Sequence, residues 1–146
     1  MLQSPPFWSA RFAIVTTALL STAACGDTPS DAALRDGTYS ATTFRITRPG
    51  LSNADVRAAG GSLLLVITKD NRVTGALRIP ASIAGTATDF VEQMDGTVEY
   101  STELAKFNQT ADTFVRDLVW QIGDRQLSVT NQTAGAAQFT IVLSRR

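Results

Sequence analysis

The sequence predicts an all-β fold, a small antiparallel up-and-down barrel of about eight strands, and three observations support it. Short apolar or alternating runs recur along residues 37–146, separated by turns of a few residues. Few helical patterns interrupt these runs, which excludes the βα alternation of a parallel sheet. Closing the strands into a barrel removes the exposed edges that an open sheet would have. A β-sandwich is the structural alternative.

The first strand is expected at Thr38–Thr47, which is rich in β-branched and aromatic residues and ends before Pro49-Gly50. The next segment, Ser52 to Asp55, resembles a capping box with Asp in place of Glu. Because Gly60-Gly61 supplies a stop signal, the pattern predicts a short helix at about 52–59. This segment would lie at one end of the sheet, or form a plain surface insertion.

A hairpin is expected next. Residues 62–68 form a continuous apolar strand, Lys69-Asp70-Asn71 supply the turn, and residues 72–79 alternate between apolar and polar side chains. Pro80 ends this second strand, and residues 81–88 form a connection of small residues. One face of the hairpin should therefore be buried.

The rest of the chain predicts further strands at residues 89–94, 97–101, 104–108, 112–122, 126–130 and 137–144. The first of these, 89–94, could instead form a helical turn boxed by Asp89 and Glu92. Asp95-Gly96 and Gly123-Asp124 are turn signals, and residues 131–135 form a loop. The strongest alternation lies in residues 112–122, which place on one strand face Phe114, Arg116, Leu118, Trp120 and Ile122.

Residues 1–24 follow the order of an export signal, with Arg11, then an apolar run, then small residues. The run is too short for a membrane-spanning helix, which needs about 20 apolar residues. Ala23 and Ala24 precede Cys25, the single cysteine of the chain. This arrangement resembles the lipobox of bacterial lipoproteins. The alternative, an ordinary secretory signal, would leave a reactive free thiol in an oxidising compartment.

The lipoprotein resemblance implies that residues 1–24 are removed and that Cys25 carries the lipid that holds the protein on its membrane. Gly26 follows the cysteine where Asp would imply inner-membrane retention, so the resemblance implies the outer membrane, facing the periplasm. Residues 25–36 are then the lipidated cysteine and a polar tether, and residues 37–146 are one domain.

The composition excludes several classes of function. The chain has no histidine and a single cysteine, so histidine-dependent catalysis and the common zinc sites lack their parts. The carboxylate pairs Glu99/Glu103 and Asp112/Asp117 are interpreted as solvated strand edges rather than as a catalytic pair. The 13 basic and 13 acidic side chains balance, which disfavours nucleic acid as a partner. We therefore expect no enzyme, cofactor or metal site.

The segment Asp36-Gly37-Thr38-Tyr39 is similar to the Gly-x-Trp opening of the lipocalin-like, or calycin, barrels, with Tyr39 in place of the tryptophan. The resemblance covers residues 37–146. It implies that Arg145 or Arg146 packs against this aromatic ring. It also implies a small apolar or amphipathic ligand inside the barrel, in a cavity lined by Tyr39, Leu77, Phe114, Leu118, Trp120 and Phe139.

Arg116 interrupts an apolar strand face and is the candidate for holding the carboxylate or phosphate of such a ligand. The simpler alternative pairs it with an internal acid, Glu92 or Glu99, or stacks it on Trp120. The expected function is thus a membrane-anchored periplasmic lipoprotein that binds a small ligand.

The alternative function is a protein-binding envelope lipoprotein, an inhibitor or assembly factor, with a filled core and no ligand. It would expose an apolar patch, for which the run at 63–67 is the hint. The identity of a ligand and the oligomeric state stay open.

Overall fold

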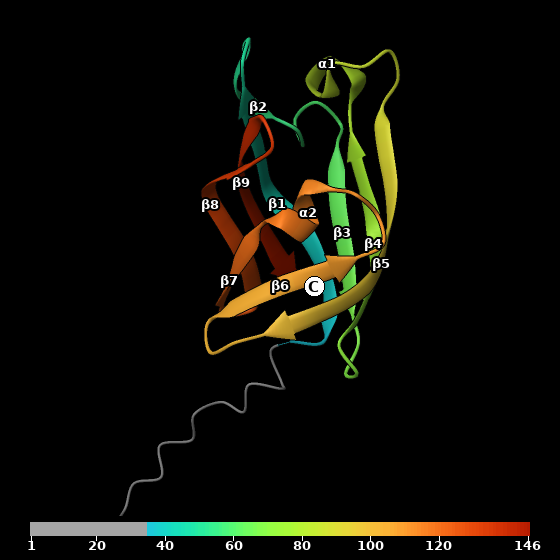
Figure 1. Cartoon of the computed structure of the whole chain (residues 1–146), viewed down its shortest axis with the longest axis vertical. Helices are drawn as coiled ribbons and strands as arrows, with labels where there is room; N and C mark the ends of the chain where they lie inside the picture. Colours follow the sequence, from blue (N-terminus) through green and yellow to red (C-terminus); the bar gives the residue numbers. More distant parts are fainter. Residues whose placement is uncertain (1–34) are drawn as a thin grey trace, which may run out of the picture.

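The computed structural model describes residues 35–146 of the chain. The predicted leader (1–24) and Cys25 lie outside the described residues. The described part forms nine strands and two single-turn helices (Figure 1). Their bounds are β1 Gly37–Arg48, β2 Leu51–Asp55, β3 Ser62–Ile67, β4 Arg72–Ile79, α1 Ala81–Ala84, β5 Phe90–Tyr100, β6 Leu104–Gln109, α2 Phe114–Asp117, β7 Val119–Gly123, β8 Gln126–Ala134 and β9 Ala137–Arg145.

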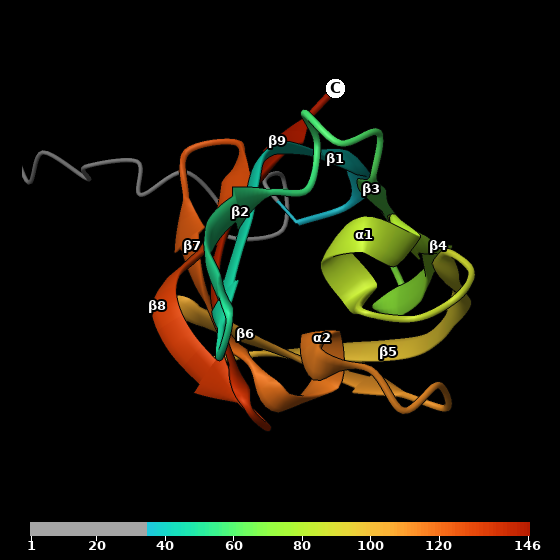
Figure 2. The same cartoon turned by 90° about the horizontal axis from the view of Figure 1, so that it is seen from above.

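Eight of the strands, β1 and β3 to β9, close into an antiparallel barrel, while β2 is an extra strand on β1. The ring closes where β9 pairs with β1, from Tyr39↔Arg145 to Thr47↔Gln138. Figure 2 shows the ring from above, and α1 lies over the upper end of the barrel beside β4. The opposite, lower end in Figure 1 holds the entry of the chain and the β3–β4 and β5–β6 turns. The predicted barrel is confirmed, and the sandwich is excluded.

The strand alternation places one set of side chains inside the ring. In β3, Leu63, Leu65 and Ile67 are at most 2% exposed, whereas Leu64 and Val66 face outward and are half-buried. The same period appears in β9, where Phe139, Ile141 and Leu143 are buried. The predicted hairpin of β3 and β4 is also confirmed. Apolar side chains from all eight strands thus meet in one core.

Strand β1 bends because its register with β9 shifts between Ala41 and Thr43. Its first residues pair with β3, from Gly37↔Ile67 to Ser40↔Leu64. Its last residues pair with β2 instead. Strands β1 and β3 therefore part beyond Ser40. The turn between β2 and β3 lies beside this opening, where the N–H of Val56 donates to the carbonyl of Phe44 at 2.9 Å.

The helix expected at 52–59 is wrong. Leu51–Asp55 is strand β2, in which Ala54 pairs with Ile46 and Leu51 and Ala54 pack against the core. Asp55 does cap a turn, but the turn follows this residue: its carboxylate accepts a hydrogen bond from the backbone N–H of Ala58 at 3.0 Å. The single turn that follows buries Val56 completely. Pairing with a long, bent β1 therefore overrides the local helix signal.

The strand expected at 112–122 is wrong in its first half. Residues Phe114–Asp117 form α2, and only Val119–Gly123 continues as β7. The turn buries Val115 completely and lets its carbonyl accept the Trp120 indole N–H at 3.3 Å. The side chains that the alternation placed on one face are therefore separated: Arg116 is partly exposed on α2, whereas Leu118 and Trp120 are buried.

Three other boundaries differ from the expectation. β5 runs unbroken from Phe90 to Tyr100, so Asp95-Gly96 is not a turn. A side chain at Gly96 would meet the carbonyl of Asn108 on β6, so this glycine allows close approach of the two strands. The small-residue connection at 81–88 contains α1, and β8 continues to Ala134 through most of the expected loop.

Candidate functional site

The barrel interior, where the ligand cavity was expected, is filled by side chains. Of the expected lining residues, Leu77, Leu118 and Trp120 are 0% exposed, Tyr39 is 1% exposed and Phe139 is 5% exposed. A cavity large enough for a ligand would leave the side chains around it accessible. These side chains therefore serve as core rather than as the wall of a preformed cavity.

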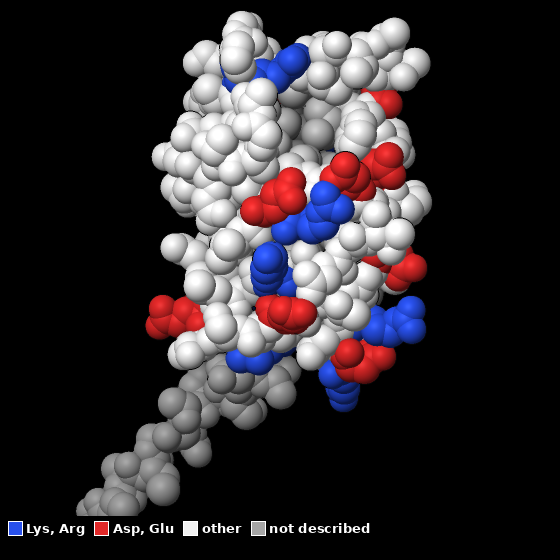
Figure 3. Space-filling view, viewed as in Figure 1, with Lys and Arg blue, Asp and Glu red and all other residues white. Residues whose placement is uncertain are grey.

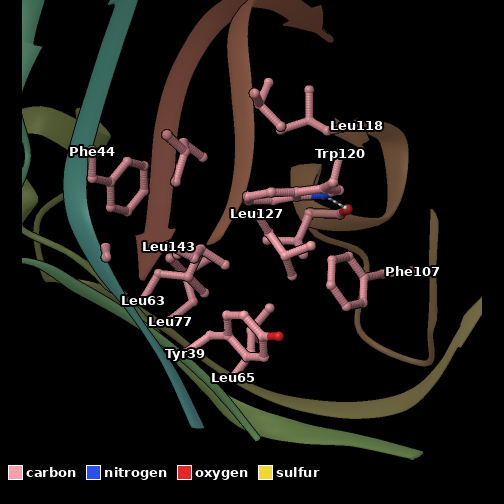
Figure 4. Packing of buried hydrophobic residues seen from close by; sticks show 14 of the residues in the cluster. Tyr39, Phe44, Leu63, Leu65, Leu77, Phe107, Leu118, Trp120, Leu127 and Leu143 are labelled. Carbon is pink, nitrogen blue, oxygen red and sulfur yellow. Dashed lines mark hydrogen bonds between the residues drawn. The ribbon is translucent and has the colours of Figure 1, made fainter. Parts of the chain in front are cut away.

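Aromatic contacts run through this core (Figure 4). The rings of Phe107 and Trp120 meet edge to face, with centroids 5.7 Å apart. Phe114, the sixth expected lining residue, is half-buried and its ring stacks on that of Phe139, with ring centroids 4.2 Å apart. The centroids of the Phe114 and Phe44 rings are 5.9 Å apart, so α2 contributes an aromatic side chain that packs between β1 and β9.

Arg116 does not point into the barrel. It lies on α2 with its side chain 40% exposed, and it pairs with Asp112 and with Asp117. Within residues 35–146 it forms no ion pair with the expected partners Glu92 and Glu99, and Glu99 instead accepts a hydrogen bond from the Asn108 side chain at 2.6 Å. The expectation that Arg116 lies on an inward strand face was wrong, because α2 replaces that part of the strand.

The lower end of the barrel is closed by polar contacts with the incoming chain. The carbonyl oxygen of Arg35 accepts hydrogen bonds from the hydroxyls of Tyr39, at 3.3 Å, and Tyr100, at 3.5 Å. The Arg35 guanidinium lies 4.5 Å from the centre of the Tyr100 ring. Arg145 pairs with Asp36 at 3.7 Å. The last two residues of the expected tether thus contact the barrel.

Burial raises the pKa of Tyr100 to about 12, with a smaller contribution from Tyr39. Burial also raises the pKa of Tyr39, against the opposing effect of Arg145. Both phenols therefore remain neutral donors at this end of the barrel. The sequence singled out Tyr39 and Arg145 through the calycin resemblance, but no sequence signal brought Tyr100 or Arg35 to them.

A hollow of about 390 Å³ lies in the outer wall where β1 and β3 part, and we call it the β1–β3 groove. It is lined by Ser40, Ala41, Arg57, Gly61, Ser62, Leu63, Leu64 and Arg146. Arg57 donates to the carbonyl of Thr42 at 2.5 Å, and Arg146 donates to the hydroxyl of Ser40 at 2.9 Å. No acidic side chain is among these lining residues. No sequence pattern indicates that Arg57 and Arg146 lie at one site.

A second, shallower hollow of about 220 Å³ lies outside β5, β6 and β7, and we call it the β6 patch. It is lined by Glu99, Tyr100, Ser101, Leu104, Ala105, Lys106 and Val119. Leu104 and Val119 are 41% and 40% exposed, whereas the side chains of Leu64 and Val66 in the expected 63–67 patch are half-buried. Figure 3 shows charges of both signs interspersed over the face of the barrel that it views.

At the upper end, the Nε of Arg48 is buried and has no hydrogen-bond partner among the described residues. Its guanidinium lies against Gly85, just after α1. Within residues 35–146, no group of three or more His, Cys, Asp or Glu side chains is placed to hold a metal ion. No helix in this part of the chain is long and apolar enough to cross a membrane.

No protein-family model, no curated protein and no solved structure matches this chain. The features of the chain that bear on its function are therefore the packed interior, the lower-end contacts and the two surface hollows described above.

Proposed function

We propose that this chain is a lipid-anchored envelope protein whose filled barrel binds a protein partner at its outer surface. The observation that carries this proposal is the packing of the interior, where Leu77, Leu118 and Trp120 have no exposed surface. Ligand pockets in proteins commonly measure about 300–1,000 Å³. Opening such a space here would displace several of these side chains from a core that stabilises the fold.

The surface favours the β6 patch as the partner's position. Its exposed leucine and valine side chains line the same hollow as Tyr100, and Glu99 and Lys106, which also line it, are cross-strand partners. An apolar centre with a charged rim is the usual anatomy of a protein interface. The mixed charges would orient the partner, and the buried apolar area would supply the affinity.

The proposed anchor is the lipid on Cys25, and it implies an orientation. Arg35 is held at the lower end by the hydroxyls of Tyr39 and Tyr100. The segment from Cys25 to Arg35 spans at most about 36 Å when fully extended. The lower end would therefore face the bilayer, and the outer membrane remains our proposal for its location, from Gly26 after the cysteine.

The alternative is the small-molecule carrier that the calycin resemblance implies. One observation favours it: Arg48 places a buried, unpartnered N–H near the upper end of the barrel. An anionic group of a ligand at that end would satisfy this donor. A carrier of this kind would bind at the mouth of the barrel rather than within the packed interior.

Two experiments in a Gram-negative host test the proposal. Cells grown with a labelled fatty acid should incorporate the label into the full chain and not into its Cys25→Ala variant. Equal incorporation in the two proteins, or none in either, would contradict the lipid anchor.

For the partner, a photo-crosslinking amino acid is placed at Leu104 or Val119, and at Thr74 as an exposed control on β4. We expect one discrete protein adduct at Leu104 and Val119 that is absent at Thr74. The same adducts at all three positions, or none at the β6 patch, would overturn the proposed interface.

A further inference from the structure

We infer that the β1–β3 groove binds a phosphoryl group, carried by a small phosphomonoester or by a lipid headgroup. This inference does not depend on the proposed protein partner, which occupies a different face. It rests on two arginines that share a hollow without any acidic side chain among its lining residues.

The two arginines of the groove have no carboxylate partner within residues 35–146, whereas several other arginines do. Arg78, Arg116 and Arg145 each pair with a neighbouring aspartate. Neither Arg57 nor Arg146 takes part in an ion pair within residues 35–146. Their positive charges in the groove are therefore not neutralised by a carboxylate side chain there.

Both guanidinium groups are also held in place. Arg57 reaches across the gap between the strands, where its Nη1 donates to the Thr42 carbonyl at the bend of β1. The backbone N–H of Arg146 donates to Thr38 at 2.9 Å, and its Nε donates to the Ser40 hydroxyl. A guanidinium has five N–H donors, so each arginine retains donors for an anion. Fixing these groups in advance lowers the entropy cost of binding.

The remaining lining residues indicate the class of ligand. The hydroxyls of Ser40 and Ser62 add donors suited to phosphate oxygens, and arginine forms forked hydrogen bonds to such groups. The side chains of Ala41, Leu63 and Leu64 form an apolar part of the wall. A volume of about 390 Å³ leaves room for a small organic substituent beside the phosphoryl group.

The groove depends on the bend of β1, which explains how a closed barrel can contain it. The backbone pairing of β1 with β3 ends at Ser40. Beyond this residue the two strands are no longer side by side, which leaves space for the groove between them. Arg57 comes from the turn after β2, and Arg146 follows β9. Two segments that are distant in sequence therefore supply the two charges.

The test uses the soluble protein made from the full Cys25→Ala chain, at constant ionic strength. Calorimetric titration with glycerol 3-phosphate and with inorganic phosphate measures the soluble ligands, and co-sedimentation with phosphatidylglycerol vesicles measures the lipid headgroup. Phosphatidylcholine vesicles are the neutral control. Saturable binding of a soluble phosphate assigns the site to that source, and binding of the anionic vesicles alone assigns it to the headgroup.

Arg57→Gln and Arg146→Gln should each weaken binding by about five-fold or more, because each removes a charged hydrogen-bond donor. Lys69→Gln, on the exposed β3–β4 turn, removes the same charge elsewhere and should change the affinity by less than about two-fold. Circular dichroism confirms that the variants are folded. Equal losses of affinity in all three variants would overturn the inference. So would the absence of binding of every probe to the protein in which both arginines are intact.

Discussion

Tyr39 and Arg145 stand directly opposite each other in the ladder that closes the barrel between β1 and β9. The Arg145 side chain covers the backbone of Gly37 and pairs with Asp36. The Tyr39 hydroxyl turns back to the carbonyl of Arg35. Ring closure and the capping of the lower end therefore depend on the same few residues. Of the two arginines that the calycin resemblance placed near Tyr39, Arg145 is the one that pairs with it in the ladder.

Gly37→Ala should lower the free energy of unfolding by about 1–3 kcal/mol. Gly37 has a φ of +140°, and an added Cβ would meet the Arg145 side chain. Gly50→Ala is the matched control, because Gly50 has a φ of +78° and open space around it. Chemical denaturation should show the larger loss for Gly37→Ala. Equal losses would mean that Arg145 does not restrict this position.

The two tyrosines of the chain should ionise only at high pH in the folded state. Both are at the lower end, and burial raises the pKa of each above the ordinary 10.0, to about 12 for Tyr100. Because the folded state favours the neutral phenol, this contribution to stability is complete below pH 10 and is lost as the pH rises toward 12.

An absorbance titration of phenolate measures this directly. The denatured protein should show both tyrosines ionising near pH 10, and Tyr100→Phe should remove the higher transition from the folded protein. Ionisation of both groups near pH 10 in the folded state would contradict the packed lower end.

Arg48→Met should leave stability unchanged or raise it by about 1 kcal/mol, because it removes a buried N–H that lacks an acceptor. Arg45→Met, an exposed position on the same strand, is the control and should have little effect. Thermal denaturation of the two variants provides the comparison. A clear loss of stability for Arg48→Met alone would show that Arg48 has a stabilising partner.

Leu65→Ala should cost about 2–5 kcal/mol, and Leu64→Ala should cost much less. The two leucines are neighbours on β3, but Leu65 is 0% exposed inside the barrel and Leu64 faces outward. Denaturant unfolding measures both. Similar, small costs for the two substitutions would indicate that the interior is loosely packed around Leu65.

Much of the barrel could be predicted because a strand buried on one face carries a two-residue period. The hairpin of β3 and β4 and the last strand, with Phe139, Ile141 and Leu143, followed from that period alone. The period failed at Phe114, where one helical turn keeps apolar side chains against the core as well as a strand would. For this reason Arg116 was expected inside the barrel, whereas its side chain is partly exposed on α2.

The candidate sites depend on features that have no local signal. Arg57 and Arg146 line one hollow because β1 bends at Ala41 and parts from β3, which is a property of the whole ring. Arg48 has an orphaned Nε only because of how its guanidinium lies against Gly85. Such sites require the tertiary arrangement and could not be predicted from spacing in the sequence.

Native mass spectrometry of the soluble Cys25→Ala protein tests whether the barrel is filled by its own side chains. The packed interior predicts that no apolar molecule survives purification inside it. After a short incubation with a medium-chain fatty acid, the spectrum should still show only the bare polypeptide. A fatty-acid adduct that disappears on denaturation, and that Leu77→Phe abolishes without unfolding the protein, would contradict the filled barrel and support a ligand inside it.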